Sequence, residues 1–178
     1  MLRLFLGLCA IVLLVGCSSK EEKALLKSYS EKTTYNKFLQ QTEKAELFEG
    51  ETSKIMVTAT YLFTPNFEKK DHRPEKFIVG VAFDDSDASR IAFKNESSAR
   101  NYTLTLNDKS ATKVEKLALN DKRLKDISFV TEWGEYYEVT FPHINSKRFS
   151  LVLKHPKYGT KKLPFAKVAK FVYTKKGF

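Results

Sequence analysis

The stretch KIMVTATYLF, residues 54–63, has the alternating pattern of a β-strand. Its apolar residues recur at every second position, as Ile55, Val57, Ala59, Tyr61 and Phe63. Successive side chains of a β-strand point to opposite faces of its sheet, so this alternation predicts a long, half-buried strand. The strand is expected to end at the turn-forming residues Thr64-Pro65-Asn66.

Short segments with a similar pattern follow along the rest of the chain. They are 77–83, 102–106, 137–141, 149–153, 161–165 and 169–173. The segment 77–83 is apolar on both faces, which predicts a central strand. Turn signals separate several of them, Asn107-Asp108 and Tyr158-Gly159-Thr160 among others. A short helix, capped by Asn120 or Asp121, is expected within 117–129.

About seven short strands separated by turns predict a mainly β protein, an antiparallel β-sandwich. Helices and strands do not alternate, which argues against a parallel α/β sheet. An immunoglobulin-like topology is the most populated version of such a sandwich. The cysteine pair that marks true immunoglobulin domains is missing from residues 51–178, to which we assign the sandwich.

The segment before the sandwich is expected to be helical. Ser19 and Glu22 have the spacing of a capping box, and Gly50 is a plausible stop. Between them, apolar residues recur at steps of three and four: Tyr35, Phe38, Leu39, Thr42, Ala45 and Phe48. We therefore predict helix over about 20–48, either packed on the sandwich or acting as a stalk or partner-binding element.

The first residues have the features of an export signal. One positive charge, Arg3, precedes an apolar run from Leu4 to Gly16. That run has about 13 residues, whereas a membrane-spanning helix needs about 20. Residues 1–16 are therefore expected to be a cleaved signal peptide and not a transmembrane anchor.

The tetrad Leu14-Val15-Gly16-Cys17 resembles the lipobox of bacterial lipoproteins. The resemblance covers only the first ~20 residues. It implies cleavage between Gly16 and Cys17, a diacylglycerol on the Cys17 sulfur and a further acyl chain, such as palmitate, on the new amino terminus. Ser18 and Ser19 differ from the aspartate of an inner-membrane retention signal. The resemblance thus implies a cell-envelope protein in residues 17–178, on the periplasmic side of the outer membrane if the cell is Gram-negative.

Basic residues are concentrated at the C-terminal end. The whole chain has 31 Lys and Arg against 21 Asp and Glu. The segment 147–178 has ten basic residues and no acidic one, so it carries the positive excess. We predict a contact surface for anionic lipid or an acidic envelope protein, made by Lys161, Lys162, Lys167, Lys170, Lys175 and Lys176. The alternative is that these lysines keep an outer strand soluble and block aggregation at its edge. Nucleic acid is not expected as a partner of an exported protein.

A second candidate surface comes from the aromatic cluster Trp133, Tyr136 and Tyr137. Aromatic rings pack on sugar faces, and the neighbouring Glu132 and Glu135 accept bonds from hydroxyls, so a carbohydrate- or lipid-handling module is the alternative function. The same residues also suit a turn that leads into a core strand. Nothing in the spacing of the two glutamates supports glycoside hydrolysis.

The remaining patterns argue for binding and against catalysis. Residues 84–96 have an oxygen-ligand spacing similar to an EF-hand loop, but Arg90 occupies the position of the turn glycine. His72, His143 and His155 lack zinc-site spacing, and neither a Gly-x-Ser-x-Gly elbow nor a phosphate-binding glycine loop is present. We expect a non-catalytic binding or scaffolding protein with no cofactor and no metal.

Overall fold

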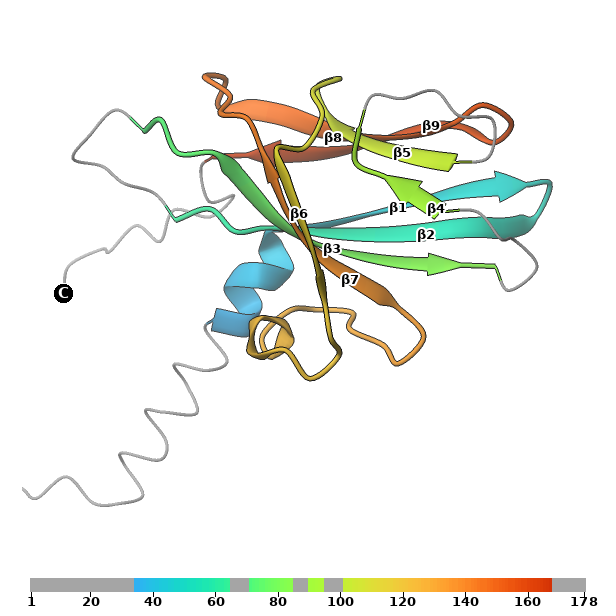
Figure 1. The fold of residues 1–178 in the computed structure, drawn as a ribbon, viewed down its shortest axis with the longest axis horizontal. Coiled ribbons are helices and arrows are strands. Elements are labelled where there is room, and N and C mark those ends of the chain that lie inside the picture. Colours follow the sequence, from blue (N-terminus) through green and yellow to red (C-terminus); the bar gives the residue numbers. More distant parts are fainter. Residues whose placement is uncertain (1–33, 65–70, 85–89, 95–100, 168–178) are drawn as a thin grey trace, which may run out of the picture. The chain divides into compact units, whose positions relative to one another are not determined.

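The structure is a computed structural model, which describes residues 34–64, 71–84, 90–94 and 101–167 (Figure 1). Its strands form two stacked sheets. Sheet A has the order β1-β2-β3-β7-β6, formed by Thr42–Glu49, Thr52–Tyr61, Glu75–Phe83, Glu135–Phe141 and Lys113–Leu117. Sheet B has the order β4-β5-β8-β9, formed by Arg90–Ala92, Asn101–Leu106, Arg148–His155 and Gly159–Ala166. The predicted β-sandwich is confirmed.

All neighbouring strands run antiparallel except β4 and β5, which pair in parallel. The predicted strand over 54–63 is β2, and β3 lies at the centre of sheet A as its two apolar faces indicate. The edge strands β1 and β9 contact each other, so one side of the sandwich is closed. Pro164 lies in β9, an edge strand of sheet B, where a residue without a backbone N–H is tolerated.

The core between the sheets follows the period of two. Val57, Val79 and Leu153 are each fully buried and alternate with residues of the outer faces. Aromatic rings fill one end of this core: Tyr61 stacks on Phe77 with ring centroids 4.9 Å apart, and Phe149 meets Tyr61 edge-on at 5.2 Å. Such pairs add specific geometry to the burial of large apolar rings.

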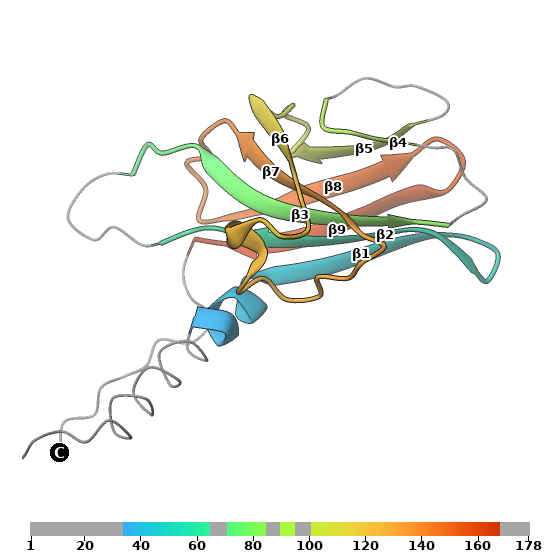
Figure 2. The same cartoon turned by 60° about the horizontal axis from the view of Figure 1, so that its bottom comes forward.

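A second apolar cluster covers the outer face of sheet A. Ile78 and Tyr136 point outward from β3 and β7 and pack against Leu117, Leu124 and Ile127. Leu124 belongs to the 3-10 helix η1 (Lys122–Leu124), which lies in the segment between β6 and β7, below sheet A in Figure 1. Figure 2 shows that segment and the short helix at 34–40, whose Phe38 joins the cluster, both on the side of sheet A.

The predicted long helix is confirmed over residues 34–40 and wrong from Thr42 onward. Residues 34–40 are helical, but Thr42–Glu49 form β1, so the sandwich begins at Thr42 and not at residue 51. Thr42, Ala45 and Phe48 fit a helical stripe, but Ala45 and Leu47 are the buried residues and lie two positions apart, as a strand requires. Both are buried when β1 pairs with β2. Residues 20–33 of the prediction lie outside the described residues.

Local signals were accurate. Asn107 and Asp108 both have positive φ, 45° and 64°, and close a tight turn between Leu106 and Lys109. Asp121 caps η1, since its side chain accepts a hydrogen bond from the Arg123 amide. Within the part of the chain that the structure describes, no helix is long and apolar enough to cross a bilayer.

Candidate functional site

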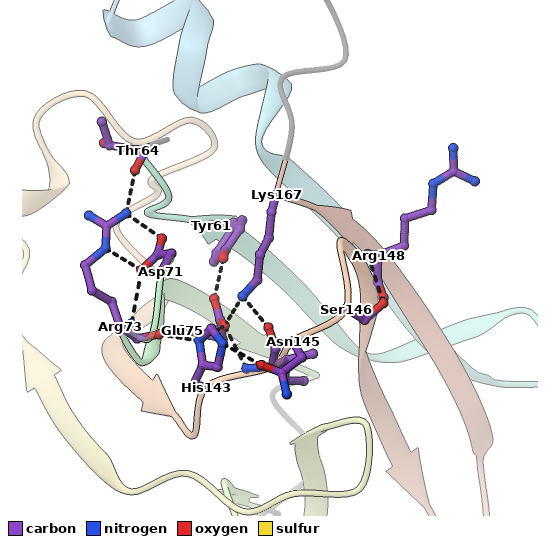
Figure 3. A network of polar contacts seen from close by, with 11 residues as sticks. Tyr61, Thr64, Asp71, Arg73, Glu75, His143, Asn145, Ser146, Arg148 and Lys167 are labelled. Atoms are coloured by element: carbon purple, nitrogen blue, oxygen red, sulfur yellow. Dashed lines mark hydrogen bonds and ion pairs between the residues drawn. The ribbon is translucent and has the colours of Figure 1, made fainter. Parts of the chain in front are cut away.

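The most concentrated polar cluster lies at one end of the sandwich, around Glu75 at the start of β3 (Figure 3). The Glu75 side chain is only 3% exposed. It shares the orientation of Phe77 and Val79, so its carboxylate enters the core. A buried carboxylate needs hydrogen bonds and a counter-charge, and three elements supply them.

Three donors saturate the Glu75 carboxylate. The Tyr61 hydroxyl of β2 donates to Oε2, the Ile144 amide donates to Oε1 at 2.9 Å, and the Lys167 ammonium donates to Oε1 at 2.6 Å. Lys167 follows β9 and also donates to the Ile144 carbonyl. Burial, and then the Glu75 carboxylate, raise the pKa of Tyr61 far above its usual value, so the phenol keeps its proton. The cluster therefore joins the end of sheet B to sheet A.

A second layer of polar groups surrounds this cluster. His143 Nδ1 donates to the Arg73 carbonyl at 2.9 Å and lies 3.4 Å from Glu75 Oε1. Arg73 makes bonds of 2.9 and 2.7 Å with the Asp71 carboxylate and 2.7 Å with the Thr64 carbonyl. Side-chain and backbone N–H groups of Arg73 hold the pKa of Asp71 well below its usual range. A cleft of about 430 Å³ borders Tyr61, Arg73 and Glu75.

This geometry suits a structural clamp better than a reacting centre. A catalytic carboxylate needs a lone pair directed at substrate, whereas both Glu75 oxygens already accept strong bonds. Breaking such a buried pair leaves an uncompensated charge, at a cost of about 3–5 kcal/mol. We call Tyr61, Glu75, Ile144 and Lys167 the inter-sheet clamp.

A different kind of site lies on the outer face of sheet B. The outward positions of β8 and β9 carry Arg148, Lys154 and Lys162, which are all exposed. The other outward positions of β5, β8 and β9 hold Thr103, Thr105, Ser150, Val152, Thr160, Pro164 and Ala166, so no carboxylate is among them. We call Arg148, Lys154 and Lys162 the cationic face.

The register places two of these cations close together. Lys154 pairs with Thr160 and Lys162 pairs with Val152, so the two lysines are diagonal neighbours across β8 and β9. Arg148 lies six residues before Lys154, about 20 Å along the strand. Figure 3 shows its side chain extending away from the inter-sheet clamp. Among the residues that the structure describes, none of the three cations forms an ion pair, which leaves them available to an external anion.

The predicted basic residues divide into three groups. Lys161 and Lys162 are both exposed on β9 but lie on opposite faces of the strand, because Lys162 pairs with the outward Val152 and Lys161 pairs with the buried Leu153. Lys167 is not part of the predicted surface, because its ammonium is turned inward to Glu75. Lys170, Lys175 and Lys176 lie outside the described residues. Arg148 and Lys154 belong to the same face as Lys162, which the two-residue alternation around Leu151 and Leu153 could have indicated.

The predicted aromatic platform is divided between different surroundings. Tyr136 is buried in the second cluster, and Tyr137 packs on Phe93 in the main core, because consecutive residues of β7 face opposite ways. Trp133 alone is open to solvent, 76% exposed. Glu132 is also exposed, while Glu135 binds the Tyr137 hydroxyl at 2.6 Å and Lys116 at 2.8 Å.

The three histidines and the described residues of the acidic stretch, 84 and 90–94, form no recognisable metal site. His72 and His143 lie close, with ring centroids 5.7 Å apart, but His155 is at the far end of β8 between Tyr102 and Tyr158. Residues 90–92 of the acidic stretch form β4, and Asp84 pairs with Lys54 at 2.9 Å. Over the described ranges, no group of three potential ligands converges.

Sequence reasoning missed Glu75, the centre of the inter-sheet clamp. A usable signal existed, since Glu75 has the same parity as the buried residues Phe77, Val79 and Val81. A charged residue in phase with a core face indicates a buried partner. Lys167 gave no such signal, because its contact spans 92 positions of sequence.

Three comparisons with known proteins leave the interpretation to this geometry. No protein-family model matches the chain, and no match was found among curated proteins or among solved structures.

Proposed function

We propose that this chain is a lipid-anchored envelope protein whose sandwich is a non-catalytic binding module. In this proposal the cationic face engages an anionic surface, either an acidic envelope protein or lipid headgroups. The observation that carries it is the composition of that face: three exposed cations and hydroxyl side chains, with no carboxylate at the outward positions.

The chemistry of the cationic face supports recognition of charge. Each cation near an anionic surface contributes about 1 kcal/mol, and flat strands present the three groups on one side. Surface ion pairs are screened by salt, so binding should weaken as ionic strength rises. Some exposed cations elsewhere pair with carboxylates of the chain: Lys157 pairs with Glu49, and Lys116 pairs with Glu135.

The anchor is supported by the leader. Arg3, the short apolar run and Leu14-Val15-Gly16-Cys17 are the elements that lipid modification requires. Two or three acyl chains on one residue hold a protein on a bilayer for a long time, since each buried methylene adds about 0.8 kcal/mol. Mass spectrometry of the protein from membranes should show an acylated Cys17 as the first residue, and an unmodified Met1–Lys20 peptide would refute the anchor.

The binding proposal is tested with a triple charge reversal, Arg148→Glu, Lys154→Glu and Lys162→Glu. Affinity for polyglutamate in low salt should fall about a hundredfold, from about 1 kcal/mol for each cation. The matched control carries the same change in charge on the other side of the sandwich, as Lys37→Glu, Lys122→Glu and Lys125→Glu. Equal losses in both variants would show a response to net charge alone and would overturn the assignment to this face.

The two anionic sources are separated by a second measurement. Binding of the parent chain to polyglutamate is compared with its binding to vesicles that contain anionic lipid, each with and without the triple reversal. A loss confined to polyglutamate identifies an acidic protein as the partner, and a loss confined to vesicles identifies lipid headgroups.

A further inference from the structure

Exposed apolar side chains gather on the side of the molecule opposite the cationic face. Five large ones lie on the helix at 34–40 and on the segment 118–134, both of which cover sheet A: Tyr35, Leu39, Leu119, Phe129 and Trp133. Among the described residues of β4, β5, β8 and β9, none is a large apolar residue that is exposed. We call the five residues the apolar side.

The backbone turn that exposes Trp133 is fixed by hydrogen bonds and close packing. It is closed by the Gly134 amide, which donates to the Thr131 carbonyl at 3.3 Å. The buried Tyr136 hydroxyl fixes the turn, since it accepts from the Thr131 amide at 2.6 Å. A Cβ added at Gly134 would lie 2.5 Å from the Tyr136 hydroxyl, so only glycine permits this approach. Because the turn is already ordered, its backbone loses little freedom when the exposed indole binds.

Phe129 is presented with backbone strain. Its φ is 66°, a region that bulky residues rarely adopt, and its side chain is 57% exposed. Because more than half of the ring is exposed, its burial does little to offset the cost of this backbone conformation. Strain of this kind persists where the surrounding structure imposes it, and it concentrates at binding elements.

The composition of the apolar side matches a membrane interface. Its segment 118–134 combines Leu119, Phe129 and Trp133 with the exposed Lys122 and Lys125, and it also carries Asp121, Asp126 and the exposed Glu132. Tryptophan and phenylalanine enter the boundary between headgroups and acyl chains, while lysines reach the phosphates. The described part of the chain also begins in the helix of the apolar side, at Thr34, with 16 residues, 18–33, between it and Cys17.

We propose that the apolar side docks on the phospholipid bilayer, at the boundary between headgroups and acyl chains. This rests on the proposed function, in which Cys17 carries the lipid. Because the cationic face lies on the opposite outer face of the sandwich, docking turns it away from the anchoring membrane. The partner of the cationic face is then an acidic protein that approaches from the side away from that bilayer, and not the lipid beneath the molecule.

The test uses the full chain reconstituted in vesicles that contain phospholipid brominated on its acyl chains, a contact quencher of tryptophan. Trp133 is the only tryptophan, so its emission reports this position alone. Docking predicts a blue shift and a loss of more than half of the emission. The matched control moves the probe to the cationic face with Trp133→Phe and Val152→Trp, and its emission should change by less than a tenth.

Three results would overturn the docking proposal. One is quenching of the Val152→Trp probe with little effect on Trp133, which would place the cationic face on the bilayer. Another is an emission of Trp133 that does not respond to vesicles. A third is a blue shift that grows with protein concentration and is insensitive to brominated lipid, which would identify a second copy of the chain as the occupant.

The anchor and the docking surface can fail separately. A chain that begins at Ser18, without the apolar leader and Cys17, should still bind vesicles through the apolar side when it is added from solution. Its partition should fall about tenfold with Leu119→Ser and Phe129→Ser together, from the loss of buried apolar area. If this chain binds in this way but the native protein lacks acyl mass, the anchor is refuted and docking stands. Binding that is unchanged by the two serines would refute docking alone.

Discussion

The two outer faces of the sandwich are built from the same alternating strands and have opposite surroundings. On sheet A, the outward residues Ile78 and Tyr136 are buried beneath Leu124 and Ile127, and the cover exposes Trp133. On sheet B, the outward residues of β8 and β9 meet solvent directly and include Arg148, Lys154 and Lys162. A single fold thereby carries the apolar side and the cationic face on opposite sides of the sandwich.

Charges on the two faces differ in the same way. On sheet A, Arg123 contacts Asp121 at 2.8 Å, Glu115 at 2.6 Å and Glu138 at 2.9 Å, so its charge is balanced within the chain. The three cations of the cationic face form no ion pair among the described residues. Arg123 thus holds the cover of sheet A to its strands, while the cationic face leaves its charges open to an external anion. Three substitutions test the difference between the two faces.

The largest effect is expected from Glu75→Gln, which breaks the clamp that keeps the two faces on one rigid body. The Lys167 ammonium, whose side chain is 12% exposed, would lose its counter-charge. The free energy of unfolding should fall by about 3 kcal/mol, measured by denaturant titration. A double variant, Glu75→Leu with Lys167→Met, should recover part of that loss, because neither charge is then left alone. Full stability in Glu75→Gln would show that the clamp does not join the sheets.

A smaller effect on the free energy of unfolding should distinguish the covered outer face of sheet A from the exposed outer face of sheet B. Leu124→Ala should lower the free energy of unfolding by about 2 kcal/mol, because Leu124 is 4% exposed in the second cluster. Val152→Ala, the matched change on the outer face of sheet B, should cost less than about 0.5 kcal/mol. Similar losses at the two positions would contradict the distinction between the faces.

The smallest effect concerns acid stability. Hydrogen bonds from Arg123 lower the pKa of Asp121 to about 2 and the pKa of Glu115 below its ordinary value. Such carboxyl groups stabilise the fold above their unfolded pKa, near 3.8 for Asp121, and this contribution is lost as the pH falls toward 2. Arg123→Ala should therefore lower the denaturation midpoint at pH 7 and flatten its decline between pH 4 and 2.

The control for acid stability is Arg148→Ala on the cationic face. With no carboxylate partner among the described residues, Arg148 should leave the denaturation midpoint unchanged at both ends of this range. A steep acid decline that persists in Arg123→Ala would assign the pH dependence to other carboxyl groups.

Patterns within one strand were predictable from the sequence, and partners distant in sequence were not. The alternation in β2 and β3, the turn at Asn107 and the cap at Asp121 depend on neighbours along the chain. β1 was mistaken for helix because Thr42, Ala45 and Phe48 also fit a helical stripe. Only its pairing with β2 decides between the two patterns.

The candidate sites follow the same rule. Lys161 and Lys162 are both exposed as predicted, but only Lys162 lies on the outer face of sheet B, because Lys161 shares the parity of the buried Leu163. Lys167 was assigned to the contact surface, yet Glu75 binds it inside. Trp133 and Tyr136 are three residues apart, but one is in solvent and the other is buried, since the turn at Gly134 separates them.

Lysine footprinting of the full chain, with an amine-reactive label and mass spectrometry, shows directly which side of the sandwich contacts the bilayer and which contacts an acidic partner. Vesicles of phosphatidylcholine and phosphatidylglycerol should protect Lys122 and Lys125 and leave Lys154 and Lys162 reactive. Polyglutamate should produce the reverse pattern. Protection of Lys154 and Lys162 by the vesicles, with Lys122 and Lys125 still reactive, would show that the cationic face, and not the apolar side, contacts the bilayer.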